Sequence, residues 1–339
     1  MTLFHVIPNL NSGGAEQFLL TLSNTLVDDY DQYIFTLKNP EQNDLFSKFS
    51  SKINFLHKKK ELVQLIRDKN KAVVICWMYP SIFEMERLRF FNKVEADVLW
   101  NIRHSSFTTF QFKQKLGLYF LGLISRLKKP EIIYCAQTAK KYHQKFLFSK
   151  KSGHVIPNGL TKEFVFSKRR EQETPYLLYV GRYIHAKGPD ILIDVFKEYF
   201  KINKTHLLKI AGHGWDLIKI PRSLRKRVEL LGNQEDLASL YANAEAFVFT
   251  SRTEGYPNAL AEACSFGLPI VTTDAGDSRV ILNDYPFGEI VNSKKRFLEK
   301  LLNLKRPTEK QQKKAALKFR ERNNFFKTKE TYIKLFSSL

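Results

Sequence analysis

Residues 254–262 read EGYPNALAE, and this stretch carries the most specific pattern in the chain. The apolar run over 245–250 predicts a strand before it, and the apolar residues after Pro257 predict the start of a helix. Gly255 and Pro257 let the backbone approach a ligand and set the direction in which that helix begins. We therefore expect free helix N–H groups at the carboxyl end of a strand, where open α/β sheets bind anions.

Glu254 and Glu262 add two carboxylates to this turn and helix. Carboxylates accept hydrogen bonds from hydroxyl groups, so the stretch combines donors for phosphate with acceptors for hydroxyls. A nucleotide sugar requires this combination. The alternative for Glu262 is the mild preference of any acid for the first turn of a helix. Glu254 lies in the preceding loop, where the helix dipole does not favour an acid.

Residues 181–188 read GRYIHAKG and follow a predicted strand over 176–179. Arg182 and Lys187 lie five positions apart in this glycine-bounded loop, so both can face one cleft. Fixed cations there would stabilise the charge that grows on a diphosphate as its bond to a sugar breaks. The alternative is a solvated loop with two ordinary surface cations.

Strands and helices alternate along the chain, which predicts the α/β class with doubly wound parallel sheets. The length of 339 residues fits two domains of about 150 residues each, with a hinge near 153–159. The first series has expected strands at 2–8, 33–37, 53–56, 73–77, 98–102, 132–134 and 154–156, and helices at 15–27, 61–68 and 139–146; the second has strands at 176–179, 206–211, 228–231, 246–249 and 269–272, and helices at 189–200 and from about 235 and 259.

Gly13 and Gly14 form a turn between the first predicted strand and the first helix. Gly14 is placed so that a ligand can approach the backbone. The third glycine of the dinucleotide fingerprint is missing, which disfavours an NAD site. Taken alone, the pair fits a purely structural turn equally well.

The net charge of +21 is unevenly distributed. Residues 1–99 are neutral, with 12 Lys or Arg and 12 Asp or Glu, whereas residues 100–158 hold 11 basic residues and one acid, Glu131 (11 − 1 = +10). A basic block confined to one segment indicates an anionic surface or an anionic substrate.

Within this basic segment, residues 113–129 have an apolar centre between basic ends. The apolar run of nine residues is too short to span a bilayer but can lie at its surface. A helix buried in the first domain is the other interpretation. We expect residues 100–158 to bind an anionic membrane surface or a lipid diphosphate. Because no leader or spanning segment is recognisable, the protein is expected in the cytoplasm, peripheral to the inner face of the plasma membrane.

Four motifs in sequence order resemble the retaining glycosyltransferases of family 4: GGAE at 13–16, IPNG at 156–159, Gly-Arg-x4-Lys-Gly at 181–188 and Glu-x7-Glu at 254–262. The resemblance spans nearly the whole chain and is best in the second half. It implies the GT-B architecture, with two Rossmann-like, doubly wound parallel-sheet domains and an interdomain cleft. It also implies an acceptor-side domain over 1–158, a nucleotide-sugar domain over 159–317, and a helix over 318–339 that packs back on the first domain.

The resemblance assigns roles to individual residues. Arg182 and Lys187 would neutralise the donor diphosphate, Glu254 would contact the donor sugar, and Glu262 would bind the ribose hydroxyls. His104 resembles the cleft histidine of the family, and His213 would line the donor pocket, with an ordinary loop position as the alternative for each. The remaining donor-binding candidates are the Gly13–Gly14 turn, Asn233 beside the base, and the backbone N–H groups of Asn258, Ala259 and Leu260.

The implied activity is transfer of a hexose or N-acetylhexosamine, with retention of configuration, from a UDP-linked donor. The acceptor would be a glycan or lipid-linked glycan in surface polysaccharide or lipopolysaccharide-type biosynthesis. Neither a metal nor another cofactor is expected. Residues 29–31 read DYD and fit a metal-binding Asp-x-Asp pattern, but they lie at the opposite edge from Gly13 and are interpreted as a solvated turn. The three separated cysteines fit buried, reduced thiols.

Three other functions compete with this one. The high charge and the many aromatic residues suit nucleic-acid binding, but the aromatic residues lie mostly inside apolar runs and no binding signature appears, so no specific nucleic-acid partner is expected. A sugar-nucleotide epimerase can share the architecture and would convert the donor without an acceptor. An inactive binding module is disfavoured because Arg182, Lys187, Glu254 and Glu262 are all present.

Overall fold

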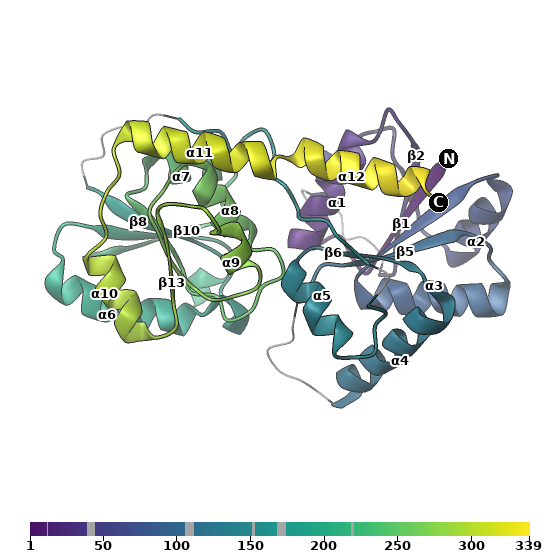
Figure 1. Ribbon diagram of the computed structural model, residues 1–339, viewed down its shortest axis with the longest axis horizontal. Coiled ribbons are helices and arrows are strands. Elements are labelled where there is room, and N and C mark those ends of the chain that lie inside the picture. Colours follow the sequence, from purple (N-terminus) through teal and green to yellow (C-terminus); the bar gives the residue numbers. More distant parts are fainter. Residues whose placement is uncertain (12, 39–44, 106–111, 151–152, 168–173, 218–219) are drawn as a thin grey trace. The chain divides into compact units, whose positions relative to one another are not determined.

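The computed structural model describes residues 1–11, 13–38, 45–105, 112–150, 153–167, 174–217 and 220–339 (Figure 1). These residues form two compact units. The first unit holds the described residues of 1–105, 112–158 and 326–339, and the second holds those of 159–325. Both units are Rossmann-like, with helices packed on a parallel sheet. The predicted fold class of two such sheets is therefore confirmed.

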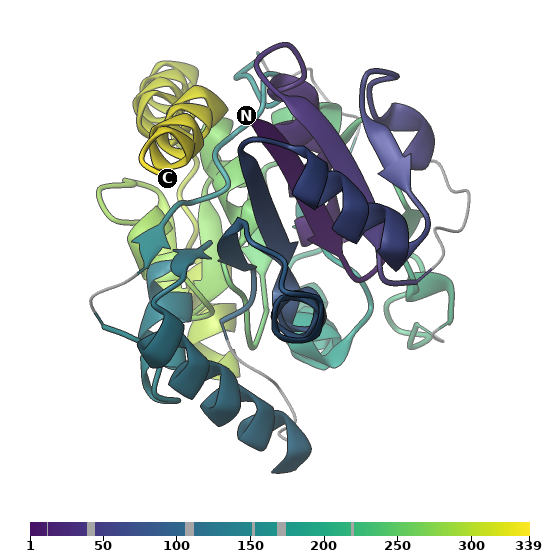
Figure 2. The same ribbon diagram turned by 90° about the vertical axis from the view of Figure 1, so that its right-hand side faces the viewer.

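The first unit is built on seven parallel strands in the order β3-β2-β1-β4-β5-β6-β7. The central strands are buried along their whole length, as their apolar sequences TLFHVI and AVVICW require. Such strands need helices on both faces of the sheet, and Figure 2 shows them there. The strands are β1 (Thr2–Ile7), β2 (Asp31–Thr36), β3 (Asn54–Leu56), β4 (Ala72–Trp77), β5 (Asp97–Ile102), β6 (Glu131–Tyr134) and β7 (His154–Val155); the helices are α1 (Gly14–Thr25), η1 (Phe46–Lys48), α2 (Lys59–Asp68), α3 (Met78–Asn92), α4 (Phe112–Lys128), α5 (Gln137–Gln144) and α12 (Phe325–Ser337).

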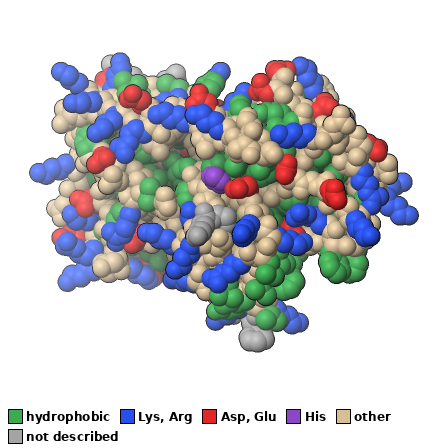
Figure 3. Space-filling view, turned by 45° about the vertical axis from the view of Figure 1, so that its right-hand side comes forward, with side chains coloured by type: hydrophobic (Ala, Val, Ile, Leu, Met, Phe, Trp, Pro, Cys, Tyr) green, Lys and Arg blue, Asp and Glu red, His purple; other side chains and the backbone are tan. Residues whose placement is uncertain are grey.

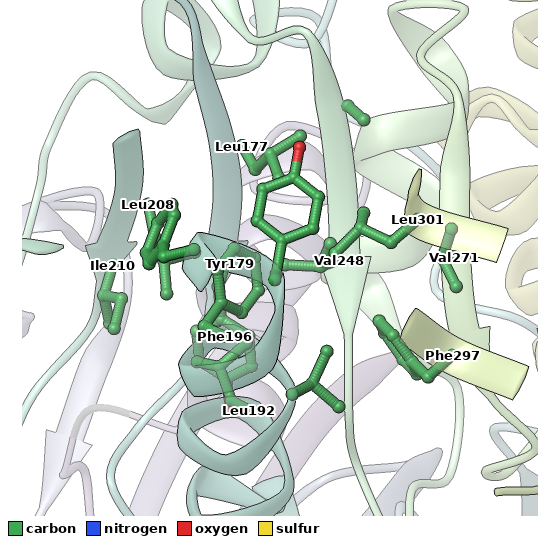
Figure 4. Close-up of a cluster of buried hydrophobic side chains, with 14 of the residues drawn as sticks. Leu177, Tyr179, Leu192, Phe196, Leu208, Ile210, Val248, Val271, Phe297 and Leu301 are labelled. Carbon is green, nitrogen blue, oxygen red and sulfur yellow. The ribbon is translucent and has the colours of Figure 1, made fainter. Parts of the chain in front are cut away.

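The second unit has six parallel strands in the order β10-β9-β8-β11-β12-β13. Its core lies between this sheet and the helices α6 and α10, where Tyr179, Phe196, Val248 and Phe297 come together (Figure 4). The strands are β8 (Tyr176–Val180), β9 (Leu207–Ala211), β10 (Val228–Gly232), β11 (Ala246–Phe249), β12 (Ile270–Thr273) and β13 (Gly288–Val291); the helices are η2 (His185–Lys187), α6 (Pro189–Ile202), η3 (Trp215–Leu217), α7 (Leu237–Asn243), α8 (Asn258–Ser265), α9 (Ser278–Ile281), α10 (Lys294–Leu302) and α11 (Glu309–Asn323).

The tail beyond residue 308 forms two helices that belong to different units. Helix α11 starts with a capping box between Thr308 and Gln311 and packs on α8 of the second unit. The chain is extended at Asn324, and α12 then packs in the first unit. Its Tyr332 is fully buried, and the Tyr332 hydroxyl accepts a hydrogen bond from Asn101 at 3.1 Å.

Four local features of the described residues also bear on the sequence. All three cysteines are buried and free, as predicted. Asp29 lies in an exposed turn and Asp31 is the exposed first residue of β2; they pair with Lys329 (2.9 Å) and Lys69 (3.4 Å). Among the described helices, none is both long enough and apolar enough to cross a bilayer. Within the same ranges, no three His, Cys, Asp or Glu side chains are grouped to hold a metal ion.

A buried polar network joins three strands of the first unit. Trp77 Nε1 donates to His5 Nδ1 at 3.3 Å, so the other ring nitrogen, Nε2, carries the proton and donates to Gln32 Oε1 at 3.0 Å. Gln32 Nε2 in turn donates to the carbonyl of Ser23 at 2.9 Å. Burial lowers the pKa of His5 to about 4, so the imidazole is neutral at physiological pH.

Replacing Gln32 with Ala is expected to destabilise the first unit by about 2–3 kcal/mol, because it leaves the His5 N–H and the Ser23 carbonyl buried without their partner. The measurement is the urea midpoint of the full chain. Gln64→Ala is the matched control, because Gln64 is exposed and bonds across its own helix to Asp68 at 2.9 Å. Equal midpoints for the two variants would contradict the importance of the network.

Candidate active site at the carboxyl edge of the second sheet

The candidate residues of the second unit gather at the carboxyl edge of its sheet. Strand order reverses between β8 and β11, and open α/β sheets bind ligands at such a switch point. The loops that leave these two strands, residues 181–188 and 250–257, contain Lys187 and Glu254. The neighbouring strands β9 and β10 end just before His213 and Asn233. The topology therefore brings the sequence-predicted residues of this unit to one edge.

Lys187 and Glu254 form a direct ion pair between the two loops. Lys187 Nζ lies 2.5 Å from Glu254 Oε1, and the side chains are 22% and 12% exposed. Ser251 Oγ donates to the same carboxylate oxygen at 2.7 Å. The cation and the carboxylate are thus held in a fixed geometry at the switch point, and the pair is partly shielded from water.

The backbone beneath this pair is tightly clamped. Tyr179 donates its hydroxyl to the carbonyl of Lys187 at 2.9 Å, and Thr250 Oγ1 donates to the carbonyl of Gly188 at 3.0 Å. Gly188 has φ +63°, and a Cβ built there would lie 2.0 Å from the Thr250 carbonyl oxygen. The two loops approach this closely only because residue 188 is glycine.

A second clamp joins the same loops on the solvent side. Arg252 donates both guanidinium NH2 groups to Asp190, at 2.7 and 2.5 Å, and its backbone N–H donates to the carbonyl of Ala186 at 2.7 Å. The bond to Arg252 lowers the pKa of Asp190, so this pair stays charged at neutral pH. Sequence reasoning missed Arg252 and Asp190, because ordinary surface charges look the same in a sequence.

Glu262 lies one turn inside α8 and has a different environment from Glu254. The Tyr241 hydroxyl donates to Glu262 Oε2 at 2.8 Å. Burial raises the pKa of the Glu262 carboxyl from 4.5 to about 7, although the Tyr241 bond and the charge of Lys187 act in the opposite direction. Tyr241 was not anticipated from the sequence.

Arg182, His213 and Asn233 lie on the exposed rim of this edge. The loops that carry the first two are joined, because Tyr183 N–H donates to the His213 carbonyl at 2.9 Å. A Cβ at Gly212, which has φ +140°, would lie 2.3 Å from the Gly181 carbonyl oxygen. The edge thus combines a partly buried pair, Lys187 and Glu254, with a polar rim that solvent and ligands can reach.

The amino end of α8 has no side-chain cap, as an anion site requires. Asn258 and Ala259 are partly exposed there. Leu260 is buried, and its N–H donates to the Pro257 carbonyl at 3.1 Å. The Leu260 N–H therefore bonds inside the helix turn.

The other three candidates, Gly13, Gly14 and His104, belong to the first unit. Gly13 caps α1 in an extended conformation (φ −142°), so no left-handed geometry demands glycine at this position. The turn lies after β1, where the first sheet has its own reversal of strand order between β1 and β4. His104 follows β5 and is half-buried. The structure places these three at the carboxyl ends of strands in their own unit.

Comparison with known proteins supports a specific superfamily. Residues 161–319 match the family model described as Glycosyl transferases group 1. The chain is 23% identical over 303 residues to the capsular polysaccharide biosynthesis glycosyltransferase CapH of Staphylococcus aureus, and the match covers 84% of each protein. These matches support the glycosyltransferase superfamily and a glycosyltransferase activity.

Two further matches also cover most or all of the chain. The chain is 23% identical over 290 residues to a Campylobacter jejuni enzyme named GalNAc-alpha-(1->4)-GalNAc-alpha-(1->3)-diNAcBac-PP-undecaprenol alpha-1,4-N-acetyl-D-galactosaminyltransferase, covering 78% of this chain and 77% of that one. The crystal structure of Anabaena Alr3699/HepE in complex with UDP superposes with a TM-score of 0.81 at 13% identity, over 100% of both chains. At this identity the superposition shows the fold, which is that of GT-B glycosyltransferases.

Gly188→Ala is expected to destabilise the second unit by about 3 kcal/mol or more, through a left-handed alanine and a clash with Thr250. Gly232→Ala is the matched control, because Gly232 has φ +65° and its Cβ would meet nothing within 4 Å. It should cost about 1–2 kcal/mol, from the backbone conformation alone. Urea unfolding of both variants gives the comparison, and a smaller loss for Gly188→Ala would contradict the close approach of the loops.

Glu262 is expected to make stability depend on pH. Because its pKa is raised in the folded state, the stabilising proton is bound at low pH and lost as the pH rises through about 7. The wild type should therefore lose about 2 kcal/mol of unfolding free energy between pH 5 and pH 8, and Glu262→Gln should not show this loss. This figure is discounted because the Glu262 side chain is partly exposed. Glu198→Gln on the exposed side of α6 is the control. Parallel pH profiles for wild type and Glu262→Gln would show that this carboxyl has an ordinary pKa.

Proposed function

We propose that the protein is a retaining, metal-independent glycosyltransferase that takes a hexose or N-acetylhexosamine from a UDP-linked donor. The acceptor is a glycan or lipid-linked glycan, and the reaction occurs at the cytoplasmic face of the membrane during surface polysaccharide assembly. The observation that carries this proposal is the clamped Lys187–Glu254 pair at the switch point of the second sheet. The UDP bound in the Anabaena structure supports the donor class, and the PP-undecaprenol in the name of the Campylobacter enzyme supports the acceptor class.

In this mechanism an oxygen of the acceptor hydroxyl bonds to the anomeric carbon while the bond from that carbon to the diphosphate oxygen breaks. The leaving diphosphate takes the proton of the hydroxyl from the same face of the sugar, so the configuration is retained. Lys187, with Arg182 from the same loop, stabilises the negative charge that develops on the diphosphate. No covalent sugar–enzyme intermediate is needed, in contrast to the retaining hydrolases.

The ion pair suits this task because it is neutral as a whole before the donor arrives. Lys187 then gains a phosphate partner, while Glu254 can accept hydrogen bonds from sugar hydroxyls. The Tyr179 and Thr250 bonds fix the backbone at Lys187 and Gly188, so little reorganisation of this loop is needed as the charge develops. Glu262 binds the ribose hydroxyls, and its ionised form is the better acceptor.

A thermal-shift screen of nucleotide sugars tests the donor site. The wild type should be stabilised by one UDP-sugar, and Lys187→Ala and Arg182→Ala should each weaken its binding at least tenfold, because each removes a charge that faces the diphosphate. Lys201→Ala is the control, because Lys201 is exposed on α6 and pairs with Glu198 of the same helix. Unchanged affinity in both site variants would refute the assigned roles.

Product analysis with the identified donor tests the reaction itself. Sugar should appear on an acceptor with the anomeric configuration of the donor, and the rate should be the same with and without a chelator. An inverted product would contradict retention. Conversion of the donor sugar in the absence of any acceptor would instead identify an epimerase.

A further inference from the structure

Helix α4 of the first unit is apolar on two opposite sides. One side packs inside the unit, with Leu118 and Leu121 buried. Gly122 is part of this contact, because a Cβ there would lie 1.8 Å from the Phe146 carbonyl oxygen. Ser125 donates its hydroxyl to the Gly122 carbonyl at 2.7 Å, which hides its polar group within the helix. This side fixes the helix to the rest of the first unit but holds only a minority of its apolar side chains.

The other side of α4 presents large apolar side chains to solvent. Leu116, Phe120, Leu123 and Leu127 follow each other at intervals of four, three and four residues and are 62, 54, 48 and 74% exposed. This spacing places them in one stripe along the helix. Phe83 of α3 extends the stripe, because its ring stacks on that of Phe120 with centroids 6.2 Å apart. We call these five residues the α4 outer face.

Exposed apolar side chains are concentrated at this place. Of 18 large apolar side chains that are exposed in the described residues, eight lie between Phe83 and Leu127 on α3 and α4. Single exposed apolar residues are normal, but a continuous patch marks a site of contact. Figure 3 shows hydrophobic side chains gathered on the lower part of the molecule, with Lys and Arg side chains among and below them.

The border of the outer face is basic. Lys113 and Lys115 flank one end of the stripe, and Arg126, Lys128 and Lys129 flank the other. Lys128 also reaches Glu86 of α3 at 2.8 Å, and Arg126 donates to the Leu147 carbonyl at 2.6 Å. Residues 100–158 contain one acid against 11 basic residues, so the field around the outer face is strongly positive. Some of these residues, 106–111 and 151–152, lie outside the described part.

We propose that the α4 outer face inserts into the acyl–headgroup boundary of an anionic membrane, with the flanking lysines and arginines on the lipid phosphates. An apolar stripe edged by cations is the arrangement that binds such surfaces. The positive charge favours an anionic membrane over a second copy of the chain, because two such faces in contact would bring like charges together. The inference deepens the proposed function, because a lipid-linked acceptor is itself held in the membrane.

Vesicle co-sedimentation of the full chain tests the surface independently of transfer. Vesicles of phosphatidylcholine with 30% phosphatidylglycerol are compared with pure phosphatidylcholine, without nucleotide sugar. The wild type should bind the anionic vesicles at least tenfold more strongly. Leu123→Ser with Leu127→Ser should reduce that binding at least tenfold, whereas Ile202→Ser with Leu317→Ser should leave it unchanged. The control residues are similarly exposed (64 and 53%) but lie in the second unit.

A fluorescent variant separates insertion from simple charge attraction. The native tryptophans Trp77, Trp100 and Trp215 are almost fully buried, so a new tryptophan in Phe120→Trp reports on the outer face. Its emission should shift to the blue on anionic vesicles, and brominated acyl chains should quench it. Binding that vanishes in high salt without any blue shift would overturn insertion.

Two further outcomes are decisive. If the wild type does not bind anionic vesicles, the membrane assignment is wrong. It is also wrong if Leu123→Ser with Leu127→Ser binds them as strongly as Ile202→Ser with Leu317→Ser. If the wild type instead forms a dimer that Leu123→Ser with Leu127→Ser abolishes, a second copy covers the face. Nucleotide-sugar binding is measured separately. A failed donor screen with intact vesicle binding would therefore contradict the proposed reaction without contradicting the membrane-binding role of the α4 outer face.

Discussion

The arrangement of the candidate site depends on the approach of two loops at the reversal of strand order in the second sheet. Gly188 lets the loop after β8 touch the carbonyl of Thr250 in the loop after β11, and Tyr179 and Thr250 fix the carbonyls on either side of this contact. The contact places Lys187 against Glu254. Without it, the charges would belong to two independent surface loops. The chemistry of the site therefore depends on backbone packing as much as on the charged side chains.

The fold of both sheets was predictable because buried parallel strands are nearly continuous apolar runs. Strands β1 and β4, with every residue buried, show this signal most clearly. Strand β13 was missed because its sequence GEIV offers only two apolar residues, too short a run to predict a strand. The break between α11 and α12 was missed because it falls at Asn324, and no proline or glycine marks this position as a helix end.

The candidate site was predictable in its residue types but not in its pairings. Glycine-bounded loops and an acid outside a helix identified Lys187 and Glu254, yet nothing in the spacing indicated that they touch. The partners Tyr241 and Arg252 come from positions 21 residues before Glu262 and 62 residues after Asp190. Contacts over such distances are set by strand order, which a single sequence does not encode locally. Arg182 was grouped with Lys187 by its loop, but the structure leaves it on the exposed rim.

Helix α12 gives the first unit an unusual order of assembly. Its Tyr332 and Phe336 are fully buried, Tyr332 packs on Phe18 at 5.9 Å, and Lys329 pairs with Asp29 at 2.9 Å. The ribosome makes this helix only after the whole second unit, whose own segment is continuous from Gly159 to Phe325. During synthesis, part of the core of the first unit therefore stays uncovered until α12 is made, whereas the second unit can complete its fold earlier. This reverses the usual N-terminal-first course of co-translational folding.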